Sequence, residues 1–250
     1  MARERKADRV ADDLLRRIVS GALAVGSLLP KEAELAEHYG VNRSVVREAI
    51  KLLEVHRLVE PIRRRGTEVL DPMRSLSPEV LRAMIAPGPG QIDLSVLRDV
   101  LEVRAELDVK MSCLAARRRT DADLEALDAT VASLRDALGD RDRFEPLTDQ
   151  LVRQVARATQ NRIYEMLVTW HQTVATDLAE VFRATRPGNE PHLKAIEILV
   201  DHIRVQDDAG LEALLQAYHR WATPRLMAAA ALHAGGSLER ALELAHARPL

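Results

Sequence analysis

The sequence predicts a mainly α-helical protein in which a winged helix-turn-helix is followed by an all-α helical bundle. Composition is the first sign, because 47% of the 250 residues are hydrophobic but only 3% are aromatic, a balance that favours helices over sheets. The second is the order of the N-terminal elements, which runs helix, helix, tight turn, helix and basic hairpin. The third is the stretch from Asp93 to the C-terminus, where apolar residues recur with helical spacing.

The N-terminal elements follow from periodicity and from the residues that begin and end helices. Residues 8–20 form an amphipathic helix. Pro30 at a first helical position opens a second helix, which ends at Gly40. Asn42 is a good N-cap for the third helix, over residues 43–57.

Two short strands, Leu58–Ile62 and Thr67–Leu70, complete this module and are joined by a basic tip at Arg63–Gly66. The pair Asp71-Pro72 ends it, and a Pro/Gly-rich break over residues 87–90 follows.

These boundaries divide the chain into three parts. We expect a DNA-binding module over residues 1–71, a linker over residues 72–92 and a helical domain over residues 93–250. In the last part we expect helices over 94–118, 121–138, 144–159, 161–185, 191–207, 209–233 and 237–247.

Several classes of protein are disfavoured by the sequence. The single cysteine, Cys113, rules out a disulfide within the chain and fits a reducing compartment. The charged start does not suit a signal peptide, and no run reaches the ~18 apolar residues of a membrane span. No catalytic, metal or cofactor motif is evident, so we expect a cytoplasmic protein that is not an enzyme.

The third helix is the candidate for reading DNA. Its N-terminal turn presents Asn42, Arg43, Ser44, Val45 and Arg47. Such a turn enters the major groove end-on, where Arg donates two hydrogen bonds to guanine and Asn or Ser reaches base edges or phosphates.

The hairpin tip is the second candidate contact with DNA. Arg63, Arg64 and Arg65 suit a minor-groove or phosphate contact, and Gly66 lets the backbone approach closely. The alternative is that all these arginines are ordinary solvated charges. We favour DNA binding because they cluster at the two tips that a winged helix presents to DNA.

The segment LLPKEAELAEHYGVNRSVVREAIKLLEVHRLVEPIRRRGTEV resembles the N-terminal domain of GntR-type regulators. The resemblance, from Ala7 to Leu70, implies that Arg43 and Arg47 read bases and phosphates. Because a single winged helix touches too little DNA for strong specificity, we also expect a two-fold symmetric homodimer on a pseudo-palindromic operator of double-stranded DNA. Family members usually carry Arg where this chain has Ala33, and Lys31 or the wing arginines could compensate.

Residues 94–232 resemble, more loosely, the all-helical FCD domain of the FadR-like subgroup. The quoted segments are LRDVLEVRAELDVKMSCLAARRRTDADLEAL and QLVRQVARATQNRIYEML, the second of which includes Asn161. The resemblance implies that the helical domain binds a small-molecule effector and dimerises.

Two charged residues fall on the apolar stripe of the helix 94–118. They are Arg104 and Asp108, and buried charge is costly unless it is paired. One interpretation is an Arg104–Asp108 pair within the helix. The other is that Arg104 projects into a cavity and binds an anionic group such as a carboxylate.

Many FCD domains hold a divalent metal through Asp-x3-His and two later histidines. The corresponding positions here are Thr148, Val152, Ile196 and Tyr218-His219, which leave one His as a ligand. Zn²⁺ needs three or four donors, so we expect no metal. Combining Asp149 with His192, His202 or His219 is a weak fallback with the wrong spacing.

The favoured function is therefore a regulator controlled by a small anionic metabolite, an organic acid or an acyl-CoA such as FadR binds. The expected effector-site residues are Arg104, Asp108, Thr148, Asn161 and His219. The alternatives are a metal-dependent FCD regulator with rearranged ligands and, remotely, a small-molecule enzyme with an accessory DNA-binding part. The long helical domain argues against a purely architectural DNA-binding protein.

Overall fold

The structure is a computed structural model that describes residues 5–175 and 188–246. The chain divides into two compact units, Met1–Asp93 and Leu94–Leu250. The expected fold class is confirmed, since a small hairpin is the sheet of the first unit and the described part of the second unit is helical. No helix within the described ranges is long and apolar enough to cross a membrane.

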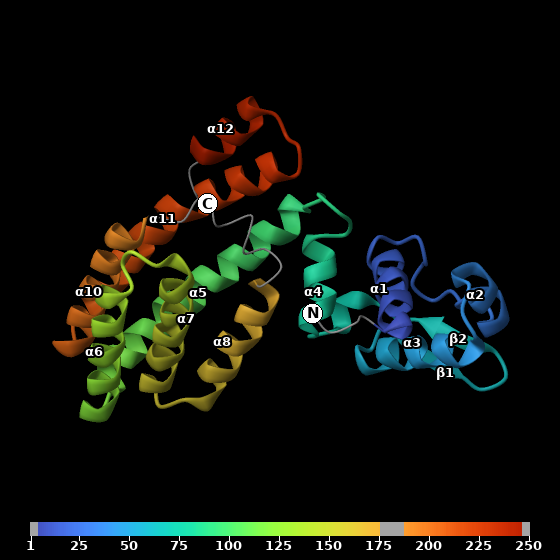
Figure 1. The fold of residues 1–250 in the computed structure, drawn as a ribbon, viewed down its shortest axis with the longest axis horizontal. Helices are drawn as coiled ribbons and strands as arrows, with labels where there is room; N and C mark the ends of the chain where they lie inside the picture. Colours follow the sequence, from blue (N-terminus) through green and yellow to red (C-terminus); the bar gives the residue numbers. More distant parts are fainter. Residues whose placement is uncertain (1–4, 176–187, 247–250) are drawn as a thin grey trace. The chain divides into compact units, whose positions relative to one another are not determined.

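The first unit is a winged helix-turn-helix (Figure 1). Its elements are α1 (Lys6–Val19), α2 (Glu32–Tyr39), α3 (Arg43–Val55), β1 (Val59–Ile62), β2 (Gly66–Val69), the 3-10 turn η1 (Pro72–Arg74) and α4 (Pro78–Ile85). The strands are antiparallel, with Val59 opposite Val69 and Ile62 opposite Gly66. A single bridge between Leu28 and Glu68 adds the segment before α2 to this wing.

One core holds the first unit together. Leu14 and Ile18 of α1 pack with Val46 and Leu53 of α3, and all four are nearly or fully buried. Burial of this apolar area is the main force that fixes α3 against α1.

Two local expectations need correction. Lys31 is the N-cap of α2, so Pro30 lies before the helix and not at its first position. The segment 72–92, expected as a linker, contains η1 and α4, and α4 buries Val80 and Ala83 in the same core as α1. The Arg16 guanidinium also donates to Ala86 O at 3.0 Å. The short helix α4 was not predicted, because it directly precedes the Pro/Gly-rich break and was counted with it as part of the linker.

The second unit is a helical bundle. Within the described residues its helices are α5 (Leu94–Arg118), α6 (Asp121–Asp136), α7 (Arg141–Ala158), α8 (Arg162–Ala175), α10 (Asn189–Arg204), α11 (Asp208–His233) and α12 (Leu238–His246). Helix α11 packs along α5, α6 packs on α7, and α12 folds back on α11 (Figure 1). Phe144, Leu127 and Ile203 are fully buried in its centre. Residues 176–185 of the helix expected over 161–185 lie outside the described residues.

Helix α8 presents a different face from the one its periodicity suggested. Ile163, Leu167, Trp170 and Val174 share helical spacing in the sequence, but Ile163 and Leu167 are 57% and 37% exposed, whereas Val174 is buried. Tyr164 and Val168 pack on the core instead. The face is rotated because α8 packs mainly on one neighbour, α7.

Candidate functional site

The N-terminus of α3 is shaped by Asn42. Its side-chain oxygen accepts hydrogen bonds from Val45 N at 3.0 Å and from Ser44 Oγ at 2.7 Å. Asn42 thus acts first as the helix cap, which leaves the positive end of the helix dipole facing solvent. Arg43 and Ser44 are exposed there, whereas Val45 is half-buried and packs on the core.

Arg47 lies one turn further along α3 and is held by α2. Its Nε donates to Glu32 Oε2 at 2.7 Å, an ion pair that joins the two helices of the helix-turn-helix. The arginine side chain is still 65% exposed, so it is oriented without being buried. Ala33 and Lys31 are exposed at the same end of α2, where the family's usual Arg would stand.

The wing tip is a tight basic turn. Arg63, Arg64 and Arg65 are all exposed, and Arg65 N donates to Ile62 O at 3.0 Å to close the turn. Gly66 has φ +128°, a backbone conformation that residues with a side chain rarely adopt. Within the described ranges none of these arginines forms an ion pair, so their charge is available to a polyanion.

A polar cluster lies inside the helical unit, where α5, α8 and α11 contribute to it. Asp108 of α5 accepts from His219 of α11, with Oδ2 2.9 Å from Nε2, and the His219 side chain is 12% exposed. Arg104, one turn before Asp108, is half-buried. It forms no ion pair with any described residue, so the first of the two interpretations, an Arg104–Asp108 pair within the helix, is not what the structure contains.

His171 of α8 belongs to this cluster and was missed by the sequence reasoning. Burial lowers the pKa of His171 to about 4, and the charge of Arg104 adds to this, while Asp108 opposes it. The imidazole is therefore neutral at neutral pH. Its position three residues after Val168, which packs on the core, and three before the buried Val174 was the available signal that it faces inward.

Two expected effector-site residues have local structural roles. Thr148 Oγ1 donates to the carbonyl of Glu145 at 2.7 Å, within α7. Asn161 Oδ1 accepts from Ile163 N at 3.0 Å, at the start of α8. Neither makes a hydrogen bond to the cluster of Arg104, Asp108 and His219.

The positions of the family's metal ligands do not converge. Val152 is 38% exposed and Ile196 is buried in the core. Of the fallback histidines, His202 bonds Asp207 at 2.9 Å and His192 packs near Phe144. Within the described residues no group of three or more His, Cys, Asp or Glu side chains could hold a metal ion.

Comparisons with known proteins agree with this architecture. Residues 6–69 match the family described as "Bacterial regulatory proteins, gntR family", and residues 99–220 match the FCD domain. An uncharacterized HTH-type transcriptional regulator of Mycobacterium tuberculosis is 29% identical over 218 residues, 86% of this chain and 87% of the relative. The galactonate operon transcriptional repressor of Escherichia coli is 29% identical over 217 residues, 84% of this chain and 92% of that protein.

Among solved structures, the chain is similar to Lar, which controls the expression of the Listeria monocytogenes agr system. That chain is 15% identical, with a TM-score of 0.56, and the match covers 94% of this chain and 99% of the other. At this identity the likeness concerns the fold alone.

Proposed function

Because the chain belongs to the GntR family of bacterial regulatory proteins, with an FCD domain after its winged helix-turn-helix, we propose that a small anionic metabolite modulates its binding to operator DNA. Its relatives are transcription regulators and not enzymes, so the general function of the chain is the regulation of transcription through DNA binding. The FadR-like subgroup, a homodimer and the bacterial cytoplasm, where the chromosome lies, are parts of the proposal.

The DNA contacts follow from the exposed charges of the first unit. We assign base reading to Arg43 and Arg47, with Asn42, Ser44 and the backbone at Val45 supporting them. Arg63, Arg64, Arg65 and Gly66 contact the phosphates or the minor groove, and Lys31 supplies a further charge. One winged helix touches too little DNA for strong specificity, which supports a two-fold dimer on a pseudo-palindromic operator.

The observation that carries the effector site is the half-buried Arg104, which has no acidic partner among residues 5–175 and 188–246. Asp108, which could have neutralised it, is bonded to His219 instead. Neutral His171 offers a further hydrogen bond beside it. A carboxylate or phosphate of the effector would complete this site by pairing with the Arg104 guanidinium.

The name of one relative favours an organic acid. The galactonate operon repressor is named for a sugar acid, whose carboxylate is the kind of group that Arg104 would bind. Acyl-CoA thioesters remain the second class to test, since their phosphates are also anions. The proposal requires no metal at the site.

A thermal-shift screen of the full-length chain against organic acids and acyl-CoA thioesters tests the proposal. A true effector at 100 times its Kd adds about 2.7 kcal/mol to the free energy of unfolding. The same ligand must alter operator affinity in a gel-shift titration. Stoichiometric zinc or nickel after purification and dialysis would instead favour the metal-dependent alternative, and no shift with any anion would contradict the effector class.

A further inference from the structure

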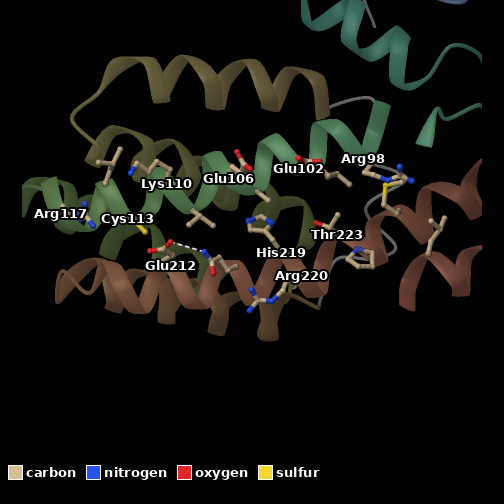
Figure 2. A pocket seen from close by; sticks show the side chains of 18 residues that line it. Arg98, Glu102, Glu106, Lys110, Cys113, Arg117, Glu212, His219, Arg220 and Thr223 are labelled. Carbon is tan, nitrogen blue, oxygen red and sulfur yellow. Dashed lines mark hydrogen bonds between the residues drawn. The ribbon is translucent and has the colours of Figure 1, made fainter. Parts of the chain in front are cut away.

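A groove of about 750 Å³ runs between α5, α11 and the end of α12, on the outside of the helical unit (Figure 2). Its floor is apolar and includes Leu101, Ala105, Val109, Leu114, Met227 and Leu244. Such a hollow exposes apolar surface along two packed helices, which is typical of a surface that another molecule covers.

The two helices that form the groove are antiparallel. Arg117 near the end of α5 pairs with Asp208 at the start of α11, and Asp108 in the middle of α5 pairs with His219. These two pairs fix the register of the helices, so the residue of α11 that lies opposite any given residue of α5 is known.

The rims of the groove carry charges of opposite sign: in this register Glu106 lies opposite Arg220, and Lys110 lies about one helical turn from Glu212. Figure 2 shows Glu102, Glu106 and Lys110 along α5 and Glu212 and Arg220 along α11. The charges of Lys110 and Glu212 both influence the pKa of the Cys113 thiol, and Figure 2 shows them on opposite rims of the groove, on α5 and α11. All five rim side chains are exposed, and within the described ranges none forms an ion pair.

We propose that this groove is the surface through which two copies of the chain associate, with α5 of each copy lying over α11 of the other. The inference rests on the proposed function in that it takes the regulator to be a dimer. A two-fold axis that runs parallel to the groove places α5 of one copy over α11 of the other. Each residue keeps its position along the direction of the helices. The rotation brings Glu106 against the partner's Arg220 and Lys110 to within about one helical turn of the partner's Glu212, which the long lysine side chain can span, and each contact occurs twice.

Charge complementarity selects a second copy as the occupant. A nucleic acid or an anionic membrane would require an excess of positive charge on the rims, but the two signs are nearly balanced. After a two-fold rotation, the positive charges of this surface face the negative charges of its copy, so the surface is self-complementary. The charges orient the two copies, and the apolar floor of the groove supplies the contact.

Charge reversal with mixing tests the proposal on the full-length chain. In the Lys110→Glu variant, the new carboxylate faces Glu212 of the partner subunit. In the Glu212→Lys variant, the new ammonium group faces Lys110 of the partner subunit. Because each contact occurs twice, the homodimer of either variant has two repulsive contacts. We expect the dimer Kd of each to rise at least tenfold in sedimentation equilibrium. An equimolar mixture of the two variants should regain the wild-type Kd, because both contacts of the heterodimer are then attractive.

Matched reversals on other helices serve as controls, namely Lys194→Glu on α10 and Glu125→Lys on α6, both exposed. These should keep the wild-type Kd. If Lys110→Glu or Glu212→Lys fails to fold, Glu106→Arg and Arg220→Glu provide the same test.

The outcomes separate this inference from the proposed function. Single variants that dimerise as the wild type does, or a mixture that does not recover, would overturn the groove as the interface while leaving a dimer formed elsewhere. A wild-type chain that is monomeric at micromolar concentration would overturn the dimer itself, and this inference with it.

Discussion

His219 and Asp108 lie 111 positions apart in the sequence, yet the Nε2 of the histidine is 2.9 Å from Oδ2 of the carboxylate. The hydrogen bond ties α11 to α5 at the centre of the helical unit. It also commits Asp108 to α11, so that Arg104, one turn away, has no acidic partner among the described residues. A contact that stabilises the fold therefore leaves a charge available for a ligand.

We expect Asp108→Ala to lower the free energy of unfolding by about 1–3 kcal/mol, because the largely buried ring of His219 loses its acceptor. Urea denaturation followed by circular dichroism measures the change. Asp99→Ala, on the same helix but exposed and outside the groove, should shift the free energy by less than about 0.5 kcal/mol. An equal effect of the two substitutions would show that the Asp108–His219 bond does not stabilise the bundle.

Replacement of Arg104 should remove the response to the effector. A charge-assisted hydrogen bond contributes about 1.5–3 kcal/mol, so Arg104→Ala should weaken binding of the acid found in the screen by roughly 10- to 100-fold. Calorimetric titration measures the Kd, and operator affinity without ligand should be unchanged. Arg162→Ala, an exposed arginine on α8, is the control. A folded Arg104→Ala protein that responds normally would leave Arg104 without a role in sensing.

Arg43→Ala and Arg47→Ala should each weaken operator binding by about 1–3 kcal/mol without unfolding the first unit, because a lost bidentate contact with a base costs that much. An operator fragment selected from random DNA by the wild-type chain, titrated at fixed salt, provides the measurement. Arg9→Ala, an exposed arginine on α1, is the matched control. Unchanged affinity would remove the substituted arginine from the interface.

His171 should make the stability of the helical unit depend on pH. Its folded pKa of about 4 lies below the ordinary value of 6.5, so the unfolded chain binds the proton more readily. The free energy of unfolding should therefore fall as pH decreases from about 6.5 to 4, by roughly 2–3 kcal/mol from this residue. His171→Gln should lack that component, which urea titrations at pH 7, 5.5 and 4 detect. Parallel pH profiles would mean that His171 is not buried as the structure describes.

Local chemistry made the DNA-binding unit predictable from the sequence. Asn42 was expected as a cap and is one, and Gly40 ends α2 with φ +60° as a left-handed residue should. Capping and turn formation involve groups within four residues of each other, so the sequence alone determines them. The helix 94–118 was likewise expected within its observed bounds.

The effector site depended on tertiary structure. Periodicity indicates which residues share a face of a helix, but not which helix that face meets. The sequence therefore singled out Arg104 and Asp108, but it could not choose between a partner one turn away and His219 on another helix. It also missed His171, because the rotation of α8 against α7 decides which of its side chains point inward. Long-range packing settled these questions, because burial of apolar area across the whole bundle outweighs a single ion pair between adjacent turns.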